Sequence, residues 1–364
     1  MNDILASTIT TAVITPVGDR QRLAGRIFRF AVAVNVALTI YSLVSAFTGF
    51  GNHIAGQYLF NSQAVGRFLF SLLVFNGIWA VIWYGVKNLL LAKFVGMSRD
   101  DRRLVFSSRM SQPFDLPGLL ARYPERRIRI TDMIGRRGRF ITLAMAIFYF
   151  LYVNISETHS ENFASAFGPQ TVFDAVLTNW LFIALYYANG FLGAVFYGAQ
   201  TRVMDGMLGR ANCLLILTFW ALFKFVLIPI GGQLQGLYAP EHFALLFAFI
   251  WGTYLVVDTL AEVGGSLYGT MKIKVRGVGD VNRKSIAGTV TGLVGGIVFG
   301  VGLVLFNHLP GPFIALGVTV AVTSTLLELY SPRGTDDFTM ATGNALVCWA
   351  FGCLLYTSPS PRDS

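Results

Sequence analysis

The sequence predicts an all-α, polytopic integral membrane protein with about nine transmembrane helices and a cytoplasmic N-terminus. Three observations lead to this fold class: an apolar composition, apolar runs long enough to span a bilayer, and a one-sided distribution of basic residues. Residues of the AVILMFWYC group make up 54% of the 364 residues and charged residues only 13%, against roughly 25% charged residues in soluble proteins. This composition excludes a soluble enzyme, a disordered chain and a collagen-like fibre.

The apolar runs give the positions of the helices. A helix needs about 20 mostly apolar residues to cross a bilayer, and the shorter runs are compatible with tilted or half-length helices. The nine expected spans are residues 27–49, 68–86, 140–155, 173–197, 213–231, 243–257, 286–306, 313–329 and 341–356.

The basic residues give the orientation. With the N-terminus in the cytoplasm, the cytoplasmic segments are 1–29, 87–139, 198–212, 258–285 and 330–340. They hold 25 of the 28 Lys and Arg residues, whereas the outer loops hold only Arg67. Basic loops of membrane proteins stay in the cytoplasm, so the net charge of +9 is attributed to orientation and not to nucleic-acid binding. In a bacterium the membrane would be the plasma (inner) membrane.

Four regions follow from this reading. They are a cytoplasmic segment at 1–26, an N-terminal membrane region at 27–257, a second membrane region at 258–356, and a polar tail at 357–364 that resembles cloning sequence. The first membrane region contains a basic insert at 87–139. The insert is either an amphipathic stretch lying on anionic lipid or a basic loop that only sets the topology; we favour the second interpretation.

Candidate functional residues gather in the second membrane region. Ionisable groups near hydrocarbon are functional candidates because burying each one there is costly. Asp258 and Glu262 are four residues apart and share one helical face. With no basic residue close in sequence, the two carboxylates should repel each other unless a cation such as Mg²⁺ lies between them. The alternative is that they end the helix at the water interface.

Features suited to phosphate binding come directly after this acidic pair. Gly265 and Gly269 allow close approach of backbone N–H groups to an anion. Basic residues and two hydroxyls follow: Lys272, Lys274, Arg276, Arg283, Lys284, Ser285 and Thr289. The two hydroxyls flank the start of the next span, where the helix dipole favours anions.

Two further patterns complete this region. Gly288, Gly292, Gly296 and Gly300 recur every four residues, which predicts close helix packing. Glu328, Asp336 and Asp337 fall on the same predicted membrane face as the Asp258 pair. The predicted topology therefore collects the acidic and basic groups at the cytoplasmic surface.

The second region resembles the polyprenol and phytol kinases, a dolichol kinase-like family that uses CTP and is related to phosphatidate cytidylyltransferase. The resemblance covers residues 258–339. The matching residues are Asp258, Ala261-Glu262, Gly265, Tyr268-Gly269, Lys272, Asn282-Arg283-Lys284-Ser285, Ala287-Gly288-Thr289, Thr325, Glu328 and Asp336-Asp337-Phe338-Thr339.

The resemblance implies a CTP-kinase-like catalytic region with Mg²⁺ as cofactor and CTP as phosphoryl donor. It implies a metal site at Asp258 with Glu262 or Asp337, and a hydroxyl-orienting or proton-accepting role for Glu328, Asp336 or Asp337. Lys284 and Arg283 would contact the triphosphate. The nucleotide-binding set is Gly265, Gly269, Lys272, Asn282, Arg283, Lys284, Ser285, Gly288 and Thr289.

The expected activity is CTP-dependent phosphorylation of a membrane lipid alcohol such as phytol, dolichol or another polyprenol at the cytoplasmic face. A phosphatidate cytidylyltransferase that makes CDP-diacylglycerol is the first alternative. We expect that branch to carry a C-terminal Ser-x-x-Lys-Arg block, which the sequence lacks. A non-enzymatic transporter is the second alternative. The sequence leaves the oligomeric state open.

Overall fold

The computed structural model describes residues 17–48, 77, 79–107, 115–137, 169–188, 190–238, 243–278 and 282–357. The expected span at 140–155 and the tail beyond Thr357 lie outside the described residues, as does most of 68–78.

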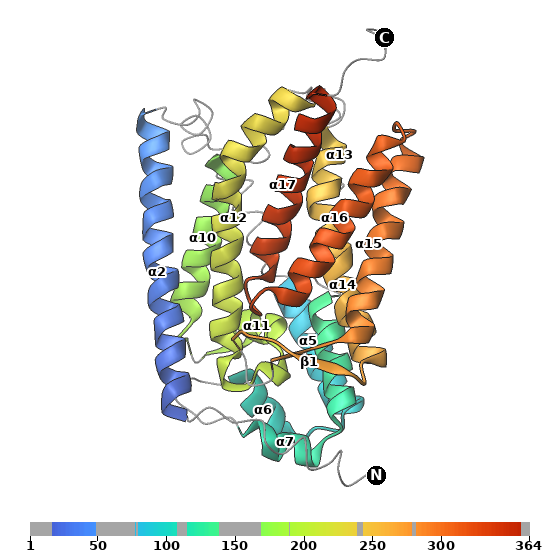
Figure 1. The fold of residues 1–364 in the computed structure, drawn as a ribbon. Helices are drawn as coiled ribbons and strands as arrows, with labels where there is room; N and C mark the ends of the chain where they lie inside the picture. The colour runs from blue at the N-terminus through green and yellow to red at the C-terminus, as the bar shows by residue number, and fades with distance from the viewer. Residues whose placement is uncertain are drawn as a thin grey trace.

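The described residues form a bundle of long helices with a smaller polar layer at one end (Figure 1). On one side, α2 (Val17–Thr48) packs against α10 (Pro169–Leu185) and α12 (Gly209–Leu237). On the other side, α14 (Thr253–Tyr268), α15 (Ile286–Phe306) and α16 (Pro312–Tyr330) pack in sequence order. The last helix, α17 (Asp336–Thr357), lies between the two groups and contacts both α12 and α16.

Five described helices are long and apolar enough to cross a membrane, which supports an integral membrane protein of the all-α class. They are Gly18–Val44, Val203–Val226, Leu245–Tyr268, Ile286–Phe306 and Pro312–Tyr330. The expected count of nine is not confirmed. Helix α15 has the bounds expected for the span at 286–306, and α16 those of 313–329 to within one residue.

The expected span at 173–197 is wrong, because the chain folds there into two helices. Helix α10 ends at Leu185, and α11 (Phe191–Gln200) begins after Gly190, whose backbone is extended. Helix α11 packs against α5 (Trp79–Lys93) and α6 (Arg99–Ser107) and has only ten residues. A hydropathy window cannot detect this turn, since both sides of it are equally apolar.

The expected end of the span at 257 is also wrong. The short helix α13 (Phe243–Phe247), the π-helical turn η5 (Ala248–Gly252) and α14 run on without a break to Tyr268. Asp258 and Glu262 therefore lie within a helix and do not end it. Their charges are compensated by arginines from elsewhere in the chain, as described below.

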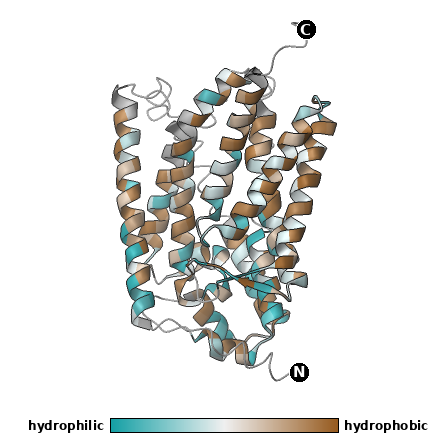
Figure 2. Cartoon of the chain, viewed as in Figure 1, coloured by the Kyte–Doolittle hydropathy of each residue, from teal (hydrophilic) through white to brown (hydrophobic). Residues whose placement is uncertain are grey.

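A small hairpin, which the sequence analysis did not predict, follows α14. Strand β1 (Lys272–Lys274) pairs in antiparallel fashion with β2 (Arg283–Ser285), with Ile273 opposite Lys284. The hairpin crosses the polar end of the bundle, where α6 and α7 (Leu116–Arg122) form its outermost part (Figure 1). Hydrophilic residues gather at this end, and the opposite part of the bundle is mainly hydrophobic (Figure 2).

The glycines of α15 form the close-packing face that their spacing predicts. Gly288, Gly292, Gly296 and Gly300 are all buried. A Cβ atom at Gly292 would lie 2.9 Å from the carbonyl oxygen of Val257 in α14. A Cβ atom at Gly300 would lie 2.7 Å from the carbonyl oxygen of Gly317 in α16. Helix α15 can therefore approach both neighbours at backbone distance.

We expect Gly300→Ala to destabilise the protein by about 1–3 kcal/mol, because the added methyl group forces backbone apart. Gly302→Ala is the matched control on the same helix, since a Cβ atom there meets nothing within 4 Å. The measurement is the midpoint of thermal unfolding in detergent. Equal midpoints for the two variants would contradict the packing role of Gly300.

Candidate functional site

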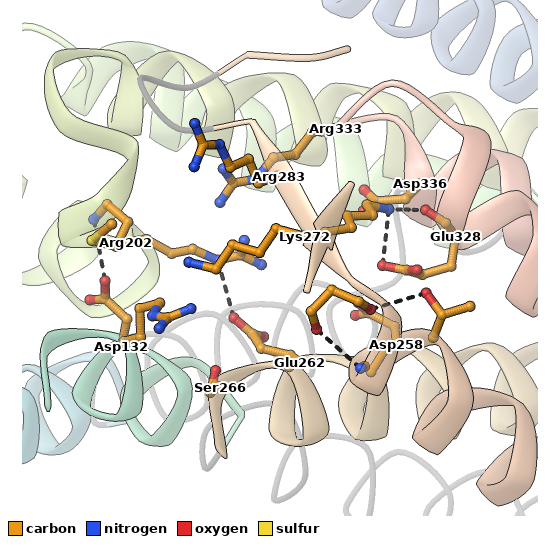
Figure 3. Close-up of a pocket in the computed structure, with 18 of the residues that line it drawn as sticks. Asp132, Arg202, Asp258, Glu262, Ser266, Lys272, Arg283, Glu328, Arg333 and Asp336 are labelled. Atoms are coloured by element: carbon orange, nitrogen blue, oxygen red, sulfur yellow. Dashed lines mark hydrogen bonds and ion pairs between the residues drawn. The ribbon is translucent and has the colours of Figure 1, made fainter. Parts of the chain in front are cut away.

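A pocket opens at the polar end of the bundle, where segments from both halves of the chain meet (Figure 3). It lies between α14, the hairpin, the first turn of α15, the end of α16 and the start of α17, and the helical segment 125–137 closes another side. Its lining residues are Glu125, Arg129, Asp132, Arg202, Met204, Asp258, Ala261, Glu262, Gly265, Ser266, Lys272, Arg283, Lys284, Ser285, Gly288, Thr289, Glu328, Arg333 and Asp336.

Three carboxylates meet in this pocket around one lysine. Oxygens of Asp258, Glu328 and Asp336 lie within 4.8 Å of one another. Lys284 Nζ is 2.9 Å from Glu328 Oε1 and 3.7 Å from Asp336 Oδ2, and it also donates to the backbone carbonyl of Glu328. Carboxylate oxygens are the ligands that Mg²⁺ prefers, so the three acids fit a divalent cation chemically.

Asp258 and Glu262 are paired with arginines, contrary to the expectation that they lack basic partners. Arg137 donates to both carboxylates, through Nη1 to Asp258 and through Nε to Glu262. Glu262 Oε1 also lies 3.0 Å from Arg136 Nη1 and 3.1 Å from Arg202 Nε. Glu262 therefore pairs with three guanidinium groups. The carboxylates that lie close to Asp258 are those of Glu328 and Asp336.

The basic insert thus contributes to the site and does more than set the topology. Its helical segment 125–137 carries Arg136 and Arg137. A buried ion pair holds this segment: Lys87 Nζ lies 3.1 Å from Asp132 Oδ1, with side chains only 1% and 3% exposed. Lys87 also donates to the carbonyl of Thr201, and Asp132 accepts from the backbone N–H of Met204. These contacts fix Arg202, which lies between Thr201 and Met204.

A second buried ion pair connects the two predicted membrane regions, residues 27–257 and 258–356. Arg333 Nη2 lies 2.6 Å from Asp205 Oδ1, in the 3-10 turn η3 (Val203–Leu208). The backbone of Arg333 also bonds to Arg276 and Val278 after strand β1. Gly277 has φ +150° there, and a Cβ atom on it would lie 2.3 Å from Arg333 Cβ. The loop that leads into Asp336 is therefore held from both sides.

The hydroxyl of Ser285 caps helix α15. Its Oγ accepts from the backbone N–H of Gly288 at 3.0 Å, as expected of an N-cap residue. Thr289 donates to the carbonyl of Ser285. One N–H at this helix end is thus already satisfied, while the Ser285 hydroxyl still has a proton to donate toward the pocket.

The two adjacent aspartates, Asp336 and Asp337, have pKa values that are shifted in opposite directions. Burial acts to raise the pKa of Asp336, but Lys284 and Arg202 outweigh it and hold this pKa below its usual range. Burial raises the pKa of Asp337, and the negative charges of Asp336 and Asp258 raise it further, to about 7. Burial acts to lower the pKa of Arg137, but Asp258 and Glu262 raise it above its usual range.

Most of the predicted site residues line this pocket. The exceptions are Asp337, Gly269 and Asn282, which are absent from the lining. A Cβ atom at Gly269 would lie 2.8 Å from Ser285 Cβ, and Asn282 donates to the carbonyl of Gly277, so both shape the hairpin. The lining residues that sequence analysis missed are Glu125, Arg129, Asp132, Arg202, Met204, Ala261, Ser266 and Arg333.

Comparisons with known proteins add no relative. No family model, no curated protein and no solved structure matches this chain. The fold and the site therefore define a class only: an integral membrane protein with a polar, charge-rich pocket at one end of its helical bundle.

We expect Lys87→Ala to destabilise the protein by about 3–5 kcal/mol, because it leaves Asp132 as an uncompensated buried charge. Lys93→Ala on the same helix is the control, since Lys93 is exposed. The double variant Lys87→Met, Asp132→Leu should regain most of the lost stability. The free energy of unfolding in detergent is compared for the two single variants and the double variant. Equal stability of Lys87→Ala and Lys93→Ala would contradict the role of the pair.

Proposed function

We propose that this protein is a membrane-embedded, CTP-dependent kinase that phosphorylates an isoprenoid lipid alcohol such as phytol, dolichol or another polyprenol. One observation carries the proposal. Asp258, Lys284, Glu328 and Asp336 belong to separate blocks of the family resemblance, yet their charged groups meet in one pocket.

The charges of the pocket suit a nucleoside triphosphate with Mg²⁺. Phosphoryl transfer depends mainly on positioning and on neutralising phosphate charge. Asp258 and Glu328 of the acidic group would hold the metal, because Mg²⁺ is usually bound by one or two carboxylates; when bound, it neutralises charge on the phosphates. Asp336 would then remain to accept a proton. Glu262, which the sequence analysis included among the ligands, is occupied by arginines. Lys272 and Arg283 line the pocket and would face the triphosphate.

A lipid alcohol has an apolar route to this pocket. Ile286, Val290, Val294 and Val298 are exposed and recur every four residues along α15, so they form an apolar stripe on one face of a candidate span. The stripe begins directly after Ser285, which lines the pocket. A prenyl chain lying on this stripe would bring its terminal hydroxyl to Ser285 and Thr289.

The reaction requires a proton acceptor. The alcohol oxygen attacks the γ-phosphorus, the bond from that phosphorus to the bridging oxygen breaks, and CDP leaves. The proton of the alcohol passes to a carboxylate. Asp336 is placed for this task because it lines the pocket. Asp337 has a pKa of about 7, which suits a general base at neutral pH, but it is absent from the pocket lining.

The test uses purified protein in mixed lipid micelles with CTP labelled at the α or the γ phosphorus. The acceptors are phytol, a polyprenol, diacylglycerol and phosphatidate. We expect γ label in phosphorylated phytol or polyprenol. Label from the α position in a product of phosphatidate would establish a cytidylyltransferase instead. Failure to bind CTP would remove both enzyme assignments and favour the transporter alternative.

We expect Asp258→Asn and Lys284→Ala each to lower turnover by about a hundredfold or more, which is typical of losing one group that stabilises transition-state charge. Lys274→Ala is the control for the lysine, because Lys274 is exposed on the same hairpin and does not line the pocket. Initial rates are compared for variants that elute as the wild type does in size-exclusion chromatography. Near-normal rates in Asp258→Asn and Lys284→Ala would refute the site.

A further inference from the structure

Arg202 reaches the pocket from the part of the chain that precedes the family resemblance at residues 258–339. It is the N-cap residue of η3, with an extended backbone at φ −87° and ψ 142°. The extended backbone separates it from α11, and Figure 3 shows its side chain directed into the pocket between Asp132 and Glu262.

Three arginines bind Glu262, and only Arg202 among them lines the pocket. Arg136 and Arg137 also contact this carboxylate but are absent from the lining. The contact of Arg202 to Glu262 uses Nε at 3.1 Å, and 25% of its side chain is exposed. In the described part of the chain, no hydrogen bond or ion pair is found for its terminal Nη1 and Nη2.

The terminal nitrogens of Arg202 distinguish it from other cations of the lining. Its charge has carboxylates nearby, since Nε pairs with Glu262 and the guanidinium helps to lower the pKa of Asp336. Lys272 and Arg333, by contrast, use their terminal nitrogens in ion pairs with Glu125 and Asp205. A partly buried N–H donor without an acceptor is unfavourable, so Nη1 and Nη2 of Arg202 are available to an anion that enters the pocket.

We infer that Arg202 binds the polyphosphate chain of the nucleotide. Its terminal Nη1 and Nη2 atoms donate hydrogen bonds to phosphate oxygens, while Nε keeps its ion pair with Glu262. The planar fork of a guanidinium suits phosphate oxygens and forms two parallel hydrogen bonds. The inference rests on the proposed function. It adds that the first predicted membrane region, residues 27–257, supplies part of the nucleotide site.

The test is equilibrium binding of labelled CTP in the presence of Mg²⁺ and in the absence of a lipid acceptor, so that no turnover is needed. We expect Arg202→Gln to weaken CTP binding about tenfold to a hundredfold, the range for losing hydrogen bonds to a charged group. Arg202→Lys should recover only part of this loss, because it keeps the charge but not the fork. Inorganic triphosphate should displace CTP from the wild type and much less effectively from Arg202→Gln.

Arg136→Gln is the matched control. It removes another of the three ion pairs of Glu262 without removing a group that lines the pocket. A loss of CTP affinity equal to that of Arg202→Gln would mean that Arg202 acts only through Glu262, and this would overturn the inference.

A phosphorylated lipid carries the same phosphate group as the nucleotide. Competition with a prenyl phosphate distinguishes binding of the lipid phosphate from binding of the nucleotide. Arg202→Gln that binds CTP normally but loses the prenyl phosphate would overturn the assignment to the nucleotide. A wild-type protein that binds no CTP would refute the proposed function itself, whereas normal CTP binding by Arg202→Gln alone refutes only the role of Arg202.

Discussion

The guanidinium of Arg137, bound at once to Asp258 and Glu262, is the contact on which the rest of the site depends. Its side chain is only 6% exposed, and carboxylates buried in an apolar bundle are unfavourable unless cations compensate them. Helix α14 itself carries no Lys or Arg, so the cation comes from a segment more than one hundred residues earlier. The position of the basic insert follows from this requirement.

The same requirement joins the two membrane regions of the molecule. Lys87 and Asp132 fix the segment that carries Arg137, and Asp205 receives Arg333 from the loop before α17. Each pair is nearly excluded from solvent, so removing either partner would leave an uncompensated charge. The pocket is therefore not a property of the C-terminal helices alone, even though the sequence pattern that points to catalysis lies wholly within them.

Local sequence features predicted what depends on local structure. The bounds of α15 and its buried glycine face follow from hydropathy and from a four-residue spacing. The break between α10 and α11 could not be predicted in this way, because the turn lies inside a uniformly apolar run. The partners of Glu262 were equally hidden: Arg136 is 126 residues away in sequence, and nothing in its neighbourhood distinguishes it from the other arginines of the insert.

Which carboxylates lie together in the site also could not be predicted from local sequence. A spacing of four residues correctly put Asp258 and Glu262 on one helical face, but packing decides what that face meets. Glycines on α15 let α14 and α16 approach it at backbone distance, and this brings the end of α16 and the start of α17 to Asp258. Glu328 and Asp336 join Asp258 there, while Glu262, one turn further along α14, meets the arginines of the insert. Helix packing thus separates the carboxylates that can hold a cation from the one that anchors the basic side of the pocket.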